Sequence, residues 1–160
     1  MQIPSYISPG IKANHLAQFS SLHPEMQTLY EQFPLSDQYF LYITAGFRGK
    51  NAQNAAFRTG NSNARWGASW HNLSPSLAMD IVPIWADSSR TIEWGTPRTK
   101  EVLKSLSSLF PGPRWGGNWH GRKDIYHYQL LDPASPPVGA SELGYILDST
   151  GIHVKIGEKE

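Results

Sequence analysis

Two histidines and an aspartate occur in short segments that could together bind a metal ion. His71 and Asp80 flank a Ser/Pro-rich turn in GASWHNLSPSLAMDIVP (residues 67–83), and His127 lies in IYHYQLL (residues 125–131). The chain contains no cysteine, so a transition metal would have to be bound by His, Asp or Glu. A catalytic zinc typically has three protein ligands and keeps a fourth position for water. These three residues are therefore candidate ligands.

Hydrolysis of an amide at such a centre also needs a proton carrier and a cation. Asp124 lies in the polar turn just before His127, where its carboxylate could take a proton from water without being a ligand. Arg48 follows an apolar stretch and could hold a substrate carboxylate or stabilise an oxyanion. Spacing alone leaves ordinary roles open, because His71, Asp80 and Asp124 are all residues typical of loops and turns, and the HExxH pattern is absent.

The elements that would position these residues alternate between helices and strands. Helical spacing and capping residues predict helices at residues 24–33, 51–59 and 96–110. Aromatic and β-branched residues predict strands at 38–47, 77–82, 114–119 and 125–131, with His127 and Gln129 on one face of the last. Residues 1–20 show no clear periodicity. The Pro/Ser/Gly-rich tail has one possible strand pair, near 145–147 and 152–156.

Length and charge limit the classes of protein that the chain can be. Its 160 residues suit one core, and we expect an N-terminal extension (1–20), a catalytic domain (21–131) and a C-terminal appendage (132–160). The net charge of +1 argues against nucleic-acid binding driven by overall charge. No signal peptide and no apolar run of bilayer length is evident, so we expect a protein made in the cytoplasm and not inserted in a membrane. We also expect a monomer.

Three segments together resemble one enzyme family. GFRGKNAQNAAFRTGN, SWHNLSPSLAMDIVP and RWGGNWHGRKDIYHYQL occur in the order seen in the zinc peptidases that unite D-alanyl-D-alanine carboxypeptidases with L-alanyl-D-glutamate peptidases. The similarity is greatest to the latter, which include bacteriophage endolysins. The resemblance implies that His71, Asp80 and His127 bind Zn²⁺. It also implies that Asp124 is the catalytic base and Arg48 the catalytic arginine.

The resemblance further implies a fold and substrate contacts. The fold is α+β, a small antiparallel sheet that carries the zinc site and is flanked by helices, as in hedgehog-like peptidases. Ser69 falls on a family serine whose hydroxyl could hydrogen-bond to substrate or to a metal-binding residue. Trp119 would line a substrate groove. Two features depart from the family pattern: NLSPS lengthens the turn between the first two ligands, and Asn118 in WGGNW replaces a common carboxylate.

The predicted function is zinc-dependent hydrolysis of an amide bond in the stem peptide of bacterial peptidoglycan, between L-alanine and D-glutamate. The resemblance suggests an endolysin-type enzyme, made in the cytoplasm of a bacterial host, that acts on the cell wall after release. One alternative is a D,D-carboxypeptidase or dipeptidase with the same zinc site. Others are a non-catalytic zinc-containing wall-binding module and a sugar-binding domain that uses the six tryptophans. Asp124 argues against a non-catalytic module, because a structural zinc needs no general base.

Overall fold

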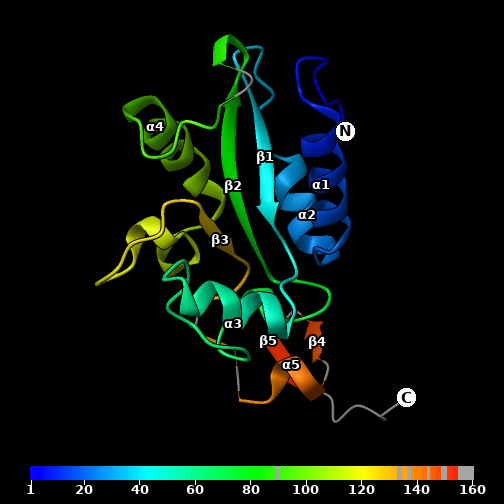
Figure 1. Ribbon diagram of the computed structural model, residues 1–160. Helices are drawn as coiled ribbons and strands as arrows, with labels where there is room; N and C mark the ends of the chain where they lie inside the picture. Colours follow the sequence, from blue (N-terminus) through cyan, green and yellow to red (C-terminus); the bar gives the residue numbers. More distant parts are fainter. Residues whose placement is uncertain (89–90, 133–134, 137, 144, 149–150, 155–160) are drawn as a thin grey trace.

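A three-stranded antiparallel sheet forms the centre of the computed structural model (Figure 1). The structure describes the whole chain except residues 89–90, 133–134, 137, 144, 149–150 and 155–160. The strands are β1 (Tyr39–Ala45), β2 (Ala78–Trp85) and β3 (His127–Gln129), in the order β1-β2-β3. With the helices described below, this sheet makes the fold α+β, as the sequence predicts.

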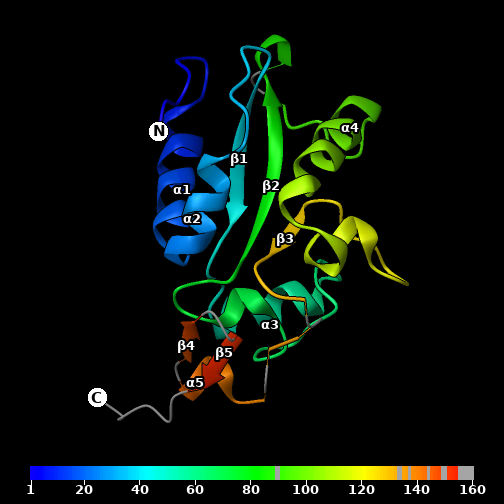
Figure 2. The same ribbon diagram turned by 180° about the vertical axis from the view of Figure 1, so that it is seen from behind.

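Helices lie on both sides of the sheet and across one end of it (Figures 1 and 2). They are α1 (Pro9–Ser20), α2 (Pro24–Glu31), α3 (Lys50–Arg58), α4 (Pro97–Leu106) and the short α5 (Ala140–Leu143). Helices α1 and α2 lie beside β1, whereas α4 lies beside β2 and α3 crosses the end of the sheet where β1 finishes. The three helices predicted from the sequence are present. None of the described helices is both long enough and apolar enough to cross a bilayer.

The main core fills the space between the sheet and the helices that flank it. Fully buried side chains from both layers meet there: Leu22, Met26, Ile43, Met79, Ile81, Leu103, Phe110 and Tyr128. Strand β2 is apolar at almost every position because it is the central strand. This core holds the strands that carry the candidate site.

Strand β2 continues past Pro83, although the sequence predicts that it stops there. Pro83 lies opposite Leu41 of β1, and the strand ends only at Trp85. The other edge of β2 pairs with β3 only from Ala78 to Asp80. The Ile81 N–H still donates to the Tyr126 carbonyl at 2.9 Å, but no described strand pairs with that edge at Pro83, so the proline there costs no ladder hydrogen bond.

The RWGGNW segment is not a strand, and that prediction is wrong. It forms two short 3-10 turns, Gly112–Arg114 and Gly116–Asn118, and only Trp115 makes an isolated bridge, to Tyr128. The segment departs from a strand because its glycines pack closely against neighbouring atoms. A Cβ on Gly116 would lie 2.2 Å from the backbone oxygen of Asp124. The turn therefore follows the backbone near the site rather than the strand propensity of tryptophan.

Helix α1 is an element that apolar periodicity does not reveal. Its one fully buried residue is a histidine, His15, so it has no apolar stripe. Ser8 caps its first turn, with Pro9 at the first helical position. The backbone N–H of Ile43 in β1 donates to His15 Nδ1 at 3.1 Å, which joins the helix to the sheet. The division of the chain at residues 20 and 132 stays a prediction.

The burial of His15 predicts a pH-dependent stability. Burial lowers the pKa of His15 to about 4, from about 6.5 in an unfolded chain. Between these values the unfolded chain binds more protons, so the free energy of unfolding should fall as the pH falls, by up to about 1.4 kcal/mol per pH unit. Urea unfolding between pH 7 and 4.5 measures this, and His15→Gln should show a shallower dependence. Equal slopes for both proteins would contradict it.

The tail forms a second, small sheet. Strands β4 (Tyr145–Asp148) and β5 (Gly151–Val154) pair antiparallel, which confirms the predicted strand pair over these residues. Residues 155 and 156, also included in that prediction, lie outside the described residues. Helix α5 precedes this pair, and its Ala140 is buried in the main core.

Candidate metal centre

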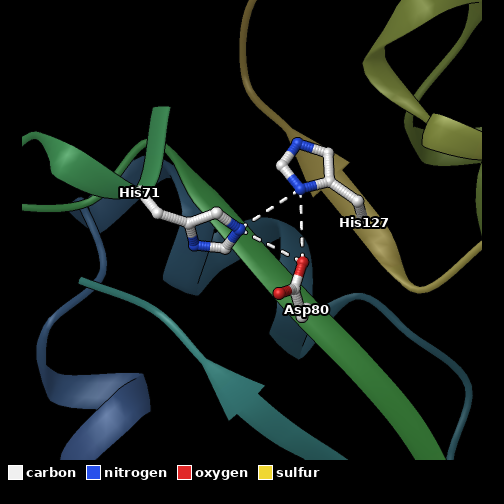
Figure 3. A group of neighbouring side chains, drawn as sticks. All are labelled: His71, Asp80 and His127. Carbon is white, nitrogen blue, oxygen red and sulfur yellow. Dashed lines mark hydrogen bonds and ion pairs between the residues drawn. The ribbon is translucent and has the colours of Figure 1, made fainter. Parts of the chain in front are cut away.

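Side chains from three distant segments converge on one point (Figure 3). His71 Nε2 lies 3.1 Å from Asp80 Oδ1 and 3.2 Å from His127 Nδ1, and His127 Nδ1 lies 3.2 Å from the same carboxylate oxygen. Three atoms that can each ligate a metal therefore form a nearly equilateral triangle. The structure brings together all three residues that the sequence singles out as ligands.

The sheet places two of these side chains by register alone. Asp80 of β2 pairs directly with His127 of β3, so both side chains project from the same face. His71 lies on the 3-10 turn Trp70–Asn72, whose first turn is capped by Ser69. Arg48, just beyond β1, donates its backbone N–H to the carbonyl of His71 at 2.7 Å. The end of β1 thus holds this turn against the strand pair.

The long turn between His71 and Asp80 is firmly attached to the core. Leu73 is fully buried. The Ser76 N–H donates to the Ser21 carbonyl at 2.8 Å, and the His23 N–H donates to the Ser76 carbonyl at 2.9 Å. The extra residues therefore pack against the segment before α2 and leave the ligand triangle intact.

Hydrogen bonds on the far side of each imidazole fix which nitrogen faces the triangle. His71 Nδ1 donates to the carbonyl of Gly46 at 2.7 Å, which leaves Nε2 as a free acceptor. Gln129 donates its amide Nε2–H to the carbonyl of Leu131, so its Oε1 must face His127 Nε2, at 2.9 Å. The His127 Nδ1 lone pair then points into the triangle. Outer hydrogen bonds of this kind orient metal-binding histidines.

The geometry fits a small divalent cation. Ligand atoms about 2.0–2.1 Å from a tetrahedral zinc lie about 3.3 Å apart, which is close to the observed separations. The two ring nitrogens can donate to the Asp80 carboxylate when they carry a proton, and when both rings are neutral at these nitrogens all three atoms can bind a cation between them. The two histidines are themselves largely buried, since His71 is 2 % exposed and His127 6 %. This group could hold a metal ion, and its donor set suits zinc.

Asp80 and the two histidines of the triangle shift one another's pKa values. Burial by itself raises the pKa of the Asp80 carboxyl, but attraction and hydrogen bonds from His71 and His127 hold it well below its usual range. Burial also disfavours the charged form of His127, but the hydrogen bond and charge of Asp80 outweigh it and raise the His127 pKa. The carboxylate is therefore ionised at neutral pH, as a metal ligand must be.

Arg48 lies beside the triangle and contacts the second oxygen of the ligand carboxylate. Its guanidinium donates to Asp80 Oδ2 at 3.2 Å and to Gln53 Oε1 at 3.3 Å. Gln53 is fully buried in α3, and its amide nitrogen donates to the Ala64 carbonyl at 2.6 Å. Asp80 thus presents one oxygen to the triangle and the other to Arg48. The structure places Arg48 at the site, and its catalytic role remains a prediction.

Asp124 lies in the same cleft and is not part of the triangle. Its Oδ1 accepts a hydrogen bond from the N–H of Tyr126 at 3.1 Å. Its backbone N–H donates to the carbonyl of Gly116, the glycine that approaches it too closely to carry a Cβ. Burial and the nearby charge of Asp80 raise the pKa of Asp124. A raised pKa favours proton acceptance and return near neutral pH.

The two candidate substrate residues line the cleft, and each also has a local structural contact. Ser69 Oγ accepts the His71 N–H at 3.3 Å, as expected of a capping residue. The Trp119 ring lies 4.9 Å from the His127 ring, and its Nε1 donates to the Pro113 carbonyl at 2.7 Å. Trp115, by contrast, is buried in the core. Contact of Ser69 and Trp119 with substrate stays a prediction.

An open cleft of about 1150 Å³ gives access to the metal centre. The loop after α3 forms one wall, the segment from Gly112 to Asp124 contributes another, and all three ligands line the cleft. Asn118 lies on the second wall and donates its side-chain N–H to the Gly112 carbonyl at 3.0 Å. A cleft of this size accepts an extended peptide or a small glycopeptide.

Comparisons with known proteins agree with this architecture. No family model matches the chain. Among solved structures, the chain is similar to the crystal structure of Serratia marcescens L-Ala D-Glu endopeptidase ChiX, with a TM-score of 0.51 and 20% sequence identity. The match covers 74% of this chain and 87% of that chain. At this identity the likeness establishes the fold, an α+β arrangement like that of a peptidase, and leaves the specific activity to be tested.

Three residues at the site were not recognised from the sequence as functional. Gln129 could have been recognised because it shares a strand face with His127. Gln53 is a buried amide in a helix of mostly small and polar residues, and no pattern marks it. Trp94 lines the cleft but comes from a loop with no recognisable pattern. These residues act through contacts that form only in the folded chain.

Gln129 supplies a direct test of the metal centre. Gln129→Leu removes the acceptor for His127 Nε2–H, so the imidazole loses its fixed orientation. Metal affinity should fall about 10- to 100-fold, as it does when outer partners of ligands are removed elsewhere. Competition with a chromophoric chelator measures this affinity. Gln129→Glu keeps an acceptor and should retain most of it. Unchanged affinity in the leucine variant would show that His127 is held by other contacts.

Proposed function

We propose that this protein is a zinc-dependent peptidase that hydrolyses an amide bond in the stem peptide of bacterial peptidoglycan, between L-alanine and D-glutamate. The observation that carries the proposal is the convergence of His71, Asp80 and His127 in an open cleft that Asp124 also lines. The likeness to a solved L-Ala D-Glu endopeptidase supports the substrate class. An endolysin-type role, with action on the wall after release from the cytoplasm of a bacterial host, is part of the proposal.

The residues of the chain divide the chemistry among them. A divalent cation at the triangle would supply Lewis acidity and lower the pKa of water there. Asp124 would accept a proton from the attacking water and return it to the leaving amine, a role that its raised pKa suits. Arg48 would hold negative charge, either a substrate carboxylate or the oxyanion formed as the carbonyl is attacked. Its bond to Gln53 keeps the guanidinium beside the triangle.

One experiment tests the proposal as a whole. Purified peptidoglycan is incubated with the protein, with and without a chelator, then with zinc restored, and new termini are identified by mass spectrometry. The proposal expects new D-glutamate amino termini that disappear with the chelator and return with zinc. Release of a terminal D-alanine or of a dipeptide would instead identify a carboxypeptidase or dipeptidase. Binding to the wall without cleavage, whether or not the metal is present, would reject an enzyme.

A further inference from the structure

Trp94 is a large aromatic side chain exposed inside the cleft that holds the metal centre. The residue is 57 % exposed, and it lines the same cleft as His127 and Asp124. Exposed indole area is unfavourable in water, and such area inside a cleft is typical of a surface that receives a ligand. Trp94 lies outside both buried clusters of the core. Its position therefore calls for an explanation other than packing.

The backbone on each side of Trp94 is firmly anchored. Glu93 accepts hydrogen bonds from Arg98 Nε at 2.7 Å and from Ser88 Oγ at 3.0 Å. The N–H of Gly95 donates to the hydroxyl of Tyr126 at 2.7 Å. The Tyr126 ring also meets the indole edge to face, with centroids 5.0 Å apart. The indole is therefore held in place before any ligand binds, which reduces the entropy lost on binding.

Tyr126 adds a polar group to this aromatic surface. Its hydroxyl oxygen accepts the Gly95 N–H, and no described residue accepts the hydroxyl hydrogen. The phenol lines the cleft, so it can donate to a ligand oxygen. Tyr126 directly precedes His127, about 3.8 Å along the backbone. Both residues line the same cleft, so a group that binds at Tyr126 shares the cleft with the metal centre.

The two sides of the cleft differ in charge. Arg48 is bonded to Gln53 of α3, and Arg122 donates to Asn63 Oδ1 at 2.8 Å in the loop after α3. Arg48 thus lies next to α3, and the guanidinium of Arg122, which comes from the segment Gly112–Asp124, reaches the loop after α3.

Among the described residues next to Trp94 in the chain, Asp87 and Glu93 both bind the guanidinium of Arg98, so two carboxylates face one cation there. An anionic group is therefore favoured on the α3 side and disfavoured beside Trp94.

We propose that Trp94 and Tyr126 form a subsite for the pyranose ring that is attached to the stem peptide. This inference rests on the proposed function and adds the direction in which the substrate binds. The substrate is asymmetric in the same sense as the cleft: the L-alanine side leads to a neutral sugar, whereas the D-glutamate side carries carboxylates. The C–H face of the sugar packs on the indole, and Tyr126 donates to a sugar or N-acetyl oxygen. The carboxylates lie toward Arg48.

A comparison of two substrates tests the subsite. The kcat/KM is measured for a soluble muropeptide and for the same stem peptide without sugar. Wild type should prefer the muropeptide, and Trp94→Ala should lower the ratio of the two constants about tenfold, as expected for loss of one aromatic contact. Trp94→Phe should restore most of the ratio. Leu35→Ala, at an 88 % exposed position outside the cleft, serves as the control and should leave both constants unchanged. An unchanged ratio in Trp94→Ala would overturn the subsite while leaving the peptidase activity established.

A binding measurement separates failure of the subsite from failure of the proposed function. The protein is titrated with the disaccharide of N-acetylglucosamine and N-acetylmuramic acid, its lactyl carboxyl converted to the amide so that it is neutral, while the indole N–H signals are followed by NMR. The signal that is missing in Trp94→Ala should shift on titration. If wild type cleaves neither peptide, the proposed function is wrong, and this titration alone decides the subsite. No shift of that signal at millimolar disaccharide would then reject it.

Discussion

Asp124→Asn is expected to bind the metal ion as tightly as wild type and to lower kcat about a hundredfold to ten-thousandfold, the range for loss of a general base. Asparagine is nearly isosteric and can still accept the Tyr126 N–H that Asp124 Oδ1 accepts at 3.1 Å. The local turn should therefore survive, as should the triangle, to which Asp124 contributes no atom. Only the capacity to take and return a proton is lost.

The measurement combines turnover of a stem peptide with metal affinity on the same sample. Asp37→Asn makes the same chemical change at an exposed position outside the cleft, and it should leave both quantities unchanged. Normal turnover by Asp124→Asn would show that another group carries the proton. Loss of metal together with turnover would instead indicate that Asp124 helps to hold the ion.

The ligands could be predicted from the sequence because three segments, in their order along the chain, resemble those of a zinc peptidase family. Residue types alone left many pairings open, since the chain has six histidines and six aspartates. The strand that carries His127 could also be predicted, and with it the face that it shares with Gln129. The pairing of Asp80 with His127 follows once β2 and β3 adjoin.

What sequence patterns missed depends on contacts between distant segments. Helix α1 has a histidine where an apolar stripe is expected, because His15 is paired with the N–H of Ile43. The RWGGNW segment is shaped by the approach of Gly116 to the Asp124 backbone, which outweighs strand propensity. The surface formed by Trp94 depends on Tyr126, more than thirty residues away. Periodicity carries no information about such pairs.

The hydrogen bonds that orient the two imidazoles also depend on contacts that sequence patterns do not reveal. Gly46 contributes a backbone carbonyl, and no sequence pattern marks a carbonyl as a partner of His71. Gly46 has no room for a side chain, since a Cβ there would lie 2.7 Å from the Gln18 carbonyl oxygen and 2.3 Å from Ser21 Oγ. The orientation of the ligands is therefore set by backbone packing that only the folded chain shows.

Asp80→Asn is expected to have the largest effect on metal binding. Asp80 supplies the only anionic atom of the triangle, and Asn replaces it with a neutral amide that is a poor ligand. The loss of metal affinity should exceed the roughly 10- to 100-fold attributed to an outer hydrogen-bond partner such as Gln129. Peptide cleavage should be lost with it. Arg48 would also lose the carboxylate that it binds at 3.2 Å.

Thermal unfolding with and without zinc measures this effect independently of activity. A ligand that binds only the folded state stabilises it by about 4 kcal/mol when present at a thousand times its Kd. Zinc should therefore raise the Tm of wild type and of Asp37→Asn clearly, and that of Asp80→Asn little or not at all. Without zinc, Asp80→Asn should still unfold cooperatively, because the packed core of β2 is unchanged. An equal zinc-dependent rise of Tm in all three proteins would place the metal elsewhere and remove the basis for a hydrolytic site in this cleft.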